Sequence, residues 1–345
     1  MPVNYQPNAR FAELFRRDER NPILTAADWP YPVNSVFNPG ATLLPDGQTL
    51  LLARVEDRTG LSHLTAARSR DGLTDWHIDA RPTLAADPQN FPEELWGLED
   101  ARVVYLPELE RWAVTYTAYS ERGPLVSLAL TSDFRTFERR GAVLPPEDKD
   151  AALFPHRING RWALIHRPQP SPLGAGAHIF VSFSPDLRDW GESALVLEAR
   201  RGGWWDADKI GLCTPPVETR EGWLIIYHGV RTTGAGVIYR VGLALLDLED
   251  PTRVRARGRE WVMGPREEYE LIGDVGYVVF PCGHVVDDAT GELRLYYGAA
   301  DSSIAVAHAN VNELLDWLKR NDEKQNSGVR SQDERLKPSF FSSDF

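Results

Sequence analysis

The sequence has little of several residue types on which whole classes of protein depend. It has two cysteines, Cys213 and Cys282, and neither lies in a CxxC pair, so we expect no disulfide framework and no zinc site. No stretch approaches the ~18 apolar residues of a membrane span, and the N-terminal segment has no apolar signal-peptide core. The net charge of −12 argues against nucleic acid or an anionic membrane as a partner. We therefore expect a soluble, cytoplasmic protein.

Patterns typical of helices are also scarce. Residues 11–17, FAELFRR, predict a short helix. Residues 311–321, VNELLDWLKRN, predict another, with Asn312 as its N-cap and Leu314, Leu315 and Leu318 on one face. Nearly everything between reads as short strands that follow turn signals such as PDG, NG or ATG. The pattern indicates an all-β fold.

Five strand segments resemble one another and indicate a repeat. They are residues 48–55, 111–119, 161–168, 222–230 and 292–300. Each precedes a second apolar strand, and three of the units end in a Ser/Asp turn and an aromatic residue, as in SRDGLTDW. Strand repeats of this size are typical of propeller blades. We predict a five-bladed β-propeller over residues 35–310, although a pair of β-sandwiches with coincidental similarity remains the alternative.

The remaining segments flank the predicted propeller. Residues 1–34 are interpreted as an N-terminal extension, and residues 311–345 as a C-terminal helix with a polar tail. The tail, from about residue 321, is rich in Ser and Asp, and we expect it to be flexible or docked on a neighbouring molecule. A homo-oligomer is left open.

A propeller brings polar residues that are distant in sequence together at its axis. One set of candidates has acidic or amide side chains and is accompanied by Arg54. Its members are Asn38, Asp100 and Asp301. The other set is basic and accompanied by a tyrosine: Lys149, Arg167, Lys209, His228 and Tyr239. Clustered like charges are unfavourable without an anion, and an oxyanion such as phosphate would match their donors. Taken singly, each residue could instead be structural: Arg167 in a salt bridge, Lys209 at the surface, His228 in the core, Asp301 in a turn.

Two adjacent carboxylates, Glu99 and Asp100, lie between apolar segments in LWGLEDARVVY (residues 95–105). Neighbouring residues of an extended segment point to opposite sides, so only one of the two can face the axis. We predict that Asp100 does. Glu99 would then tune the pKa of Asp100, bind sugar, or brace the loop against Arg102.

Together these motifs resemble those of glycoside hydrolase family 130. The resemblance covers roughly residues 20–310 and rests on segments in the family's order, among them NPGATLL, GLEDARV, KDAALFP, INGRWALIHRP, WLIIYHGV and LYYGAADSSIAVA. Members of the family are five-bladed propellers, mostly mannoside phosphorylases with some β-mannosidases. The resemblance thus implies the same fold as the repeat and an enzyme that acts on β-mannosides.

The resemblance also implies roles for the candidates. Asp100 matches the proton donor, although Ala101 stands where the family usually has proline. Asn38, Arg54 and Asp301 match positions that hold the mannosyl unit. Four residues match the family's phosphate-binding positions: Arg167, Lys209, His228 and Tyr239. Lys149 matches such a position less closely. Because the family's hydrolases lack much of this basic set, its presence favours phosphorolysis.

The implied reaction is inverting attack of phosphate on a β-1,4- or β-1,2-mannoside, which releases α-mannose 1-phosphate. The substrate would be a manno-oligosaccharide or a mannosyl-glucose, with phosphate as co-substrate and no metal or organic cofactor. The proton would be relayed through the mannose 3-hydroxyl, and Asp100 must then hold a proton near neutral pH, so we expect a raised pKa. The alternatives are a β-mannosidase of the same family, an arabinanase-type glycosidase, and a sugar-binding propeller without activity.

Overall fold

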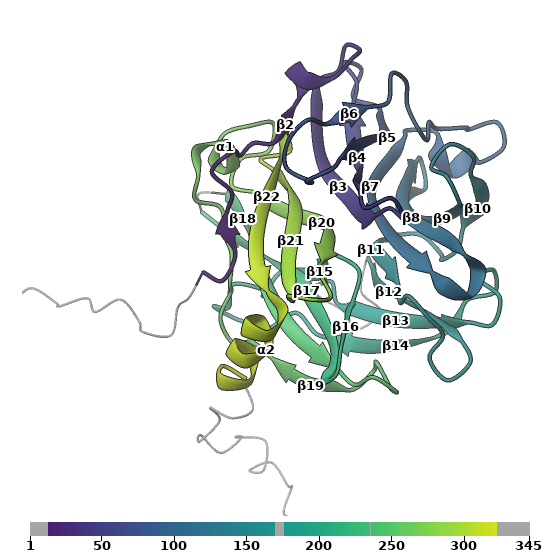
Figure 1. Ribbon diagram of the computed structural model, residues 1–345. Helices are drawn as coiled ribbons and strands as arrows, with labels where there is room; N and C mark the ends of the chain where they lie inside the picture. Colours follow the sequence, from purple (N-terminus) through teal and green to yellow (C-terminus); the bar gives the residue numbers. More distant parts are fainter. Residues whose placement is uncertain (1–12, 170–175, 235, 323–345) are drawn as a thin grey trace, which may run out of the picture.

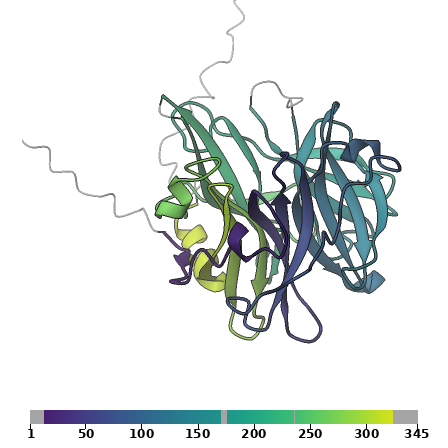
Figure 2. The ribbon, with the colours of Figure 1, turned by 90° about the horizontal axis from the view of Figure 1, so that it is seen from above.

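A computed structural model describes residues 13–169, 176–234 and 236–322. Five antiparallel sheets surround a common axis (Figure 1), which confirms the predicted all-β, five-bladed propeller. Seen from the side, the strands run between two faces where the loops gather (Figure 2). Blade one comprises β3 (Ser35–Leu43), β4 (Thr49–Glu56), β5 (Ser62–Ser69) and β6 (His77–Ile78). Blade two comprises β7 (Leu98–Leu106), β8 (Arg111–Ser120), β9 (Gly123–Thr131) and β10 (Glu138–Ala142).

The other three blades follow the same plan with small additions. Blade three comprises β11 (Asp148–Leu153), β12 (Trp162–Pro168), β13 (Ile179–Ser184) and β14 (Gly191–Leu197). Blade four comprises β15 (Lys209–Leu212), β16 (Val217–Thr219), β17 (Gly222–Thr233), β18 (Gly236–Leu246) and β19 (Val254–Arg257). Blade five comprises β20 (Val279–Val286), β21 (Glu292–Ala299) and β22 (Ser303–Asn310), joined by β1 (Arg16–Arg17) and β2 (Leu24–Thr25). The helices are η1 (Ala26–Asp28), η2 (Pro92–Glu94), η3 (Pro107–Leu109), α1 (Glu268–Leu271) and α2 (Val311–Arg320).

The innermost strands are β3, β7, β11, β15 and β20, which surround the axis in Figure 1. The strand segments that revealed the repeat are the second strands of the blades: β4, β8, β12, β17 and β21. The innermost strands are the segments that precede these second strands in the sequence. From the sequence alone, those segments were interpreted as connections between strands. The core lies between neighbouring blades, as where Ile165 and Val181 of blade three share a buried cluster with Ile225 and Tyr227 of blade four.

The shared ending of three repeats is a capped turn. Asp71, Asp133 and Asp186 each follow the third strand of a blade, and each accepts hydrogen bonds from the backbone N–H groups two and three residues ahead. A short acidic side chain that replaces a backbone acceptor stabilises such turns. This physical requirement explains why the Ser/Asp motif recurs.

The start of the chain completes the last blade. The helix predicted over residues 11–17 is wrong for its described part, because Arg16 and Arg17 form β1 and pair with His308 and Ala307 of β22; residues 11 and 12 lie outside the described residues. Strand β2 pairs with the other end of β22. The first and last strands of the fold are therefore joined within one sheet.

The predicted C-terminal helix is present as α2. Leu314, Leu315 and Leu318 are buried, which confirms the predicted apolar face. The predicted cap is wrong by two residues: the Asn310 side chain accepts a hydrogen bond from the backbone N–H of Asn312 at 3.0 Å. Most of the predicted polar tail, residues 323–345, lies outside the described residues. No helix in the described part of the chain is long and apolar enough to cross a membrane.

Candidate active site

Three of the innermost strands carry the same irregularity. The pairing register shifts between Phe37 and Gly40 in β3, between Glu99 and Arg102 in β7, and between Lys149 and Ala152 in β11. Within these bulges, Asn38, Asp100 and Asp150 have φ of 46°, 50° and 55°. Asn and Asp tolerate this left-handed backbone better than most residues, and a bulge redirects a side chain. The recurring signal is an Asn or Asp followed by Pro or Ala.

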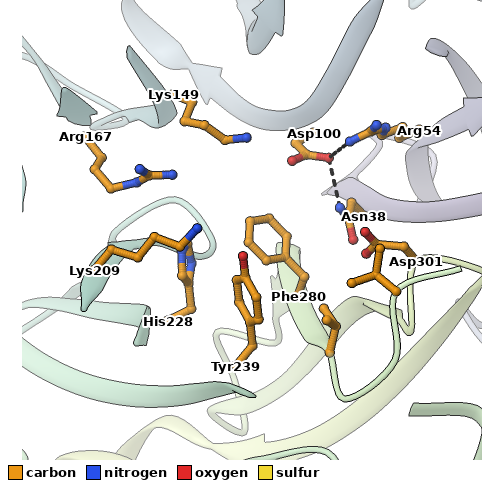
Figure 3. Close-up of a pocket in the computed structure, with 12 residues that line it drawn as sticks. Asn38, Arg54, Asp100, Lys149, Arg167, Lys209, His228, Tyr239, Phe280 and Asp301 are labelled. Carbon is orange, nitrogen blue, oxygen red and sulfur yellow. Dashed lines mark hydrogen bonds and ion pairs between the residues drawn. The ribbon is translucent and has the colours of Figure 1, made fainter. Parts of the chain in front are cut away.

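All of the predicted site residues except Glu99 line one pocket at the propeller axis (Figure 3). They come from all five blades, and Asp301 lies in the turn between β21 and β22. Sequence reasoning missed the apolar wall of the pocket, which Val275, Val278 and Phe280 form. These side chains carry no chemical mark in the sequence that separates them from core residues. The structure thus brings the two predicted sets together, facing each other across one cavity.

The acid side of the pocket comprises Asn38, Arg54, Asp100 and Asp301, and Glu99 adjoins it through its contact with Arg54. The Asp100 Oδ1 atom accepts a hydrogen bond from Asn38 Nδ2 at 2.9 Å and one from Arg54 Nη1 at 3.2 Å. Arg54 Nη2 donates to Glu99 Oε1 at 3.0 Å and lies 3.7 Å from Glu56. Glu99 and Asp100 therefore share one guanidinium. Asp100 and not Glu99 lines the pocket, as predicted. The reasoning from alternation is nevertheless wrong, because the bulge and the positive φ of Asp100 interrupt it and both carboxylates bind Arg54.

The proton on the acid side is not where we predicted it. Burial alone would raise the pKa of Asp100, but the charges of Arg54, Lys149 and Arg102 outweigh it and hold that pKa below its ordinary value. The predicted raised pKa of Asp100 is therefore wrong. Burial, together with the neighbouring charge of Asp100, raises the pKa of Asp301 to about 7. Near neutral pH, Asp301 therefore takes up a proton more readily than Asp100.

The cationic side comprises Lys149, Arg167, Lys209, His228 and Tyr239, with Asp150 beneath them. Arg167 Nε donates to Asp150 Oδ2 at 2.8 Å. The Asp150 carboxylate also lies 3.6 Å from Arg102 and 3.5 Å from His228. Burial would raise the pKa of Asp150, but Arg167 and its other neighbours hold it far below its usual range. Sequence reasoning passed over Asp150, although it repeats the bulge signal of Asp100.

His228 differs from the predicted cation. Burial lowers its pKa to about 3 despite the attraction of Asp150, so the ring is neutral at neutral pH, and the prediction of a basic His228 is wrong. Lys209 lies with its Nζ atom 5.6 Å from the centre of the Tyr239 ring, and burial and Arg167 lower its pKa. Burial raises the pKa of Tyr239 to about 12. The positive charge therefore belongs to Lys149, Arg167 and Lys209.

Arg102 is almost completely buried and lies close to Asp100 on the acid side and to Asp150 on the cationic side. Its guanidinium donates to the carbonyl oxygens of Cys213 at 3.0 Å, Leu212 at 3.1 Å and Asp100 at 2.8 Å. The possibility that Arg102 pairs with Glu99 is therefore wrong. Instead, Arg102 fixes the Asp100 bulge of blade two against blade four. Within the described residues, no group of three or more His, Cys, Asp or Glu side chains could hold a metal ion.

Comparison with known proteins identifies the family of this chain. A family model described as β-1,4-mannooligosaccharide phosphorylase matches residues 13–320. The chain belongs to glycoside hydrolase family 130. Within family 130 it is 33% identical over 314 residues to a β-1,4-mannooligosaccharide phosphorylase of Ruminococcus albus, an alignment that covers 89% of this chain and 91% of the relative.

Family 130 relatives that are named for another mannosidic linkage, β-1,2, show a comparable similarity to this chain. A β-1,2-mannobiose phosphorylase of Listeria innocua is 38% identical over 261 residues, which cover 75% of this chain and 70% of the relative. The structure of a β-1,2-mannobiose phosphorylase from Listeria innocua, in complex with β-1,2-mannobiose, superposes with a TM-score of 0.80 at 32% identity, over 89% of this chain and 99% of the other.

Proposed function

We propose that this protein catalyses the inverting phosphorolysis of β-mannosides and releases α-mannose 1-phosphate. The observation that carries the proposal is the division of one pocket into two chemically opposite sides. The buried carboxyl group of Asp100 and its hydrogen-bond partners face three cations. The names of the family relatives point to the same reaction. The reaction needs an acid for the leaving group and a place for an anionic nucleophile, and the pocket offers both.

In the proposed reaction, Lys149, Arg167 and Lys209 hold phosphate, and Asn38, Arg54 and Asp301 hold the mannosyl unit. A phosphate oxygen attacks the anomeric carbon while the bond from that carbon to the leaving oxygen breaks. The leaving oxygen takes the proton of the mannose 3-hydroxyl, which is replaced by the proton of Asp100. Phosphate is already an anion, so it needs positioning and charge neutralisation rather than a base. We propose that no metal or organic cofactor takes part.

The lowered pKa of Asp100 requires an account of how this residue gains its proton. Lys149 extends its ammonium group into the space between Arg167 and Asp100 (Figure 3). Bound phosphate offsets the charges of Lys149 and its neighbours, and it adds a negative charge near Asp100. Both effects favour the protonated carboxyl group. We infer that phosphate binding prepares Asp100 to act as an acid.

A β-mannosidase is supported less well by the same geometry. Inverting hydrolysis needs a second carboxylate, which activates water on the face opposite the leaving group. On the cationic side, the described residues place only Asp150 near that position, and Asp150 is buried in its ion pair with Arg167. A carboxylate held in this way is a poor base. A sugar-binding propeller without activity gives no reason for the three cations.

Relatives named for β-1,4- and for β-1,2-linked substrates are similarly related to this chain, and we propose that the linkage it cleaves is one of these two. We propose that the protein acts in the cytoplasm on small oligosaccharides and phosphate, without nucleic acid or membrane as a partner. Its assembly as a homo-oligomer stays a prediction.

The decisive experiment is incubation with β-1,4- and β-1,2-mannobiose, with and without phosphate. We expect mannose 1-phosphate of α configuration, formed only when phosphate is present, which proton NMR detects directly. Release of free mannose at the same rate with and without phosphate would refute phosphorolysis and support the mannosidase. No turnover of either disaccharide or of longer oligomers would support the binding protein.

A further inference from the structure

A chain of polar side chains in contact crosses blade three, and the proposed reaction does not use it. Each strand of the blade supplies one member: Asp148 of β11, His166 of β12, Ser182 of β13 and Ser193 of β14. His166 Nδ1 lies 2.6 Å from Asp148 Oδ2, and its Nε2 lies 2.9 Å from Ser182 Oγ. Ser182 Oγ lies 2.5 Å from Ser193 Oγ. The chain therefore runs from the innermost strand of the blade to its outermost strand (Figure 1).

The order of these groups is that of a Ser–His–Asp catalytic triad, but burial excludes that role. Ser182 is completely buried, and His166 and Asp148 are 3% and 2% exposed, so no substrate reaches the Ser182 hydroxyl. An ionised carboxylate can only accept hydrogen bonds, so His166 Nδ1 donates to Asp148. The second contact of the ring, with Ser182, fixes its orientation. The chain can therefore influence only the residues that it holds in place.

Two of the three cations of the pocket, Lys149 and Arg167, are the direct sequence neighbours of Asp148 and His166. Lys149 pairs with Arg167 across β11 and β12. The second oxygen of Asp148, Oδ1, accepts a hydrogen bond from the backbone N–H of Arg167 at 3.1 Å. The Asp148 carboxylate thus joins the strand that carries Lys149 to the strand that carries Arg167, through one backbone contact and one side-chain contact.

Both cations lie close to the ends of their strands, where such support matters most. Strand β11 begins at Asp148, and β12 ends at Pro168. Only two residue pairs, Asp148 with Pro168 and Lys149 with Arg167, precede the bulge in β11. A bulge disrupts the local ladder of hydrogen bonds, and regions with few such bonds open most easily. The contacts of the Asp148 carboxylate therefore reinforce a short stretch of pairing.

The other two bulged blades show that the fold itself does not require a polar pair here. Counted from the bulge, the positions that correspond to Asp148 and His166 are Val36 and Ala53 in blade one, and Leu98 and Tyr116 in blade two. All four belong to buried hydrophobic clusters. A buried ionisable pair often adds no more stability than apolar residues of similar size. Among these three blades, the polar pair occurs in the one that carries two cations next to it.

We propose that His166 and Asp148 are positioning residues, which hold Lys149 and Arg167 at the separation that bound phosphate requires. This inference rests on the proposed function and adds two residues to it. Binding groups are placed accurately when neighbouring side chains lock them by packing and hydrogen bonds. Neither His166 nor Asp148 lines the pocket, so both act through the two cations and take no part in the chemistry of the anomeric carbon.

The first test replaces the polar pair with an apolar pair, as blades one and two have. In Asp148→Val with His166→Leu, the KM for phosphate should rise about tenfold, the worth of one charge-assisted hydrogen bond. The KM for mannobiose and the kcat at saturating phosphate should stay nearly unchanged, because the acid side is intact. A thermal melt confirms that the variant is folded. A folded variant with an unchanged KM for phosphate, or with equal rises in both KM values, would overturn the assignment.

Two conservative variants of His166 separate its two contacts. In His166→Asn the amide group lies near the position of Nδ1 and can donate to Asp148, whereas in His166→Gln it lies near the position of Nε2 and faces Ser182. His166→Asn should therefore keep most of the wild-type phosphate affinity, and His166→Gln should lose about as much as the double variant. Equal KM values for phosphate in the two variants would contradict positioning through Asp148.

Blade five offers a matched control. His308 Nε2 lies 2.9 Å from Asp18 Oδ2, and neither residue lines the pocket. Asp18→Val with His308→Leu should leave the KM for phosphate unchanged. A rise in this control would overturn the inference, because it would show that the loss of any His–Asp pair in the propeller weakens the site.

Calorimetry with inorganic phosphate distinguishes a failure of this inference from a failure of the proposed function. Weaker phosphate binding by the double variant and by His166→Gln would support the positioning role even if the wild-type protein did not cleave mannobiose. Equal binding by wild type and variants would overturn the positioning role alone. A wild-type protein that binds no phosphate would overturn both.

Discussion

The two sides of the pocket manage excess charge in opposite ways. On the acid side, Glu99, Asp100 and Asp301 outnumber their guanidinium, Arg54. On the cationic side, Lys149, Arg167 and Lys209 outnumber their carboxylate, Asp150. The acid side can lower its negative charge by taking up a proton near neutral pH, since the pKa of Asp301 lies at about 7. The cationic side has several positive charges close together. Burial and the neighbouring charge of Arg167 lower the pKa of Lys209 there.

The difference reflects the ligands that the two sides are proposed to bind. A sugar is uncharged and cannot neutralise carboxylates, so a proton must do so. Phosphate is an anion and neutralises the cations itself. The comparison therefore predicts that ligand binding changes protonation more than it changes shape, and each of the following variants tests one side against the other.

The largest effect is expected from the acid side. Asp100→Asn removes the only proposed proton donor and should lower kcat about 1000-fold, within the range of general acid catalysis. Phosphate binding, measured by calorimetry, should be retained because the cations remain. A variant with more than a tenth of the original kcat would show that another group supplies the proton.

Arg167→Met should damage the cationic side in two respects. It weakens phosphate binding and leaves Asp150 buried without its closest partner, so we expect a loss of roughly 3–5 kcal/mol in unfolding free energy at pH 7. Because the folded pKa of Asp150 is depressed, its charge contributes stability above its ordinary pKa and loses it as the pH falls. The difference between variant and wild type should therefore shrink below about pH 4. Denaturant unfolding across pH checks this, and a pH-independent difference would contradict it.

Lys209→Met offers the matched comparison, since Lys209 makes no hydrogen bond to Asp150 in the structure. We expect the KM for phosphate to rise about 10- to 100-fold, the worth of one charge-assisted hydrogen bond, with little loss of stability. Steady-state kinetics with varied phosphate and a thermal melt measure the two quantities. An unchanged phosphate dependence would remove Lys209 from the site.

The two smallest effects concern pH and should have opposite signs. Lys149→Met removes a cation that favours the Asp100 carboxylate, so the pKa of Asp100 should rise and the basic limb of kcat, measured at saturating phosphate and mannoside, should move to higher pH. Above about pH 7, where Asp301 is ionised, Asp301→Asn removes a neighbouring negative charge, so the pKa of Asp100 should fall and that limb should move to lower pH. Profiles of kcat between pH 5 and 9 separate these outcomes. Shifts in the same direction would contradict the proposed coupling.

The sequence was sufficient to predict the blades and the residues that meet at the axis, because strand repeats and family motifs both depend on local pattern. Asp100 and Arg167 could be chosen in this way. The raised pKa of Asp301 could not be predicted, since it depends on burial and on charges from other blades that only folding brings near. The neutral state of His228 likewise depends on burial. Asp150 was within reach, because its bulge repeats the Asn38 and Asp100 pattern.

Backbone geometry explains the other failures. The alternation rule put Glu99 and Asp100 on opposite sides, and it fails because a left-handed residue interrupts the strand. The helix predicted at residues 11–17 was drawn from local composition, whereas Arg16 and Arg17 form an edge strand whose partner lies almost the whole chain away.

That last pairing has a consequence for how the protein is made. Arg16 pairs with His308, so the first strand cannot find its neighbour until the final blade has been synthesised. Contacts of such large sequence separation slow folding. Because the pocket takes residues from every blade, its two sides meet only once the circle closes. Activity should therefore appear late during refolding, after most strands have formed, and a nascent chain that lacks β22 should have no working site.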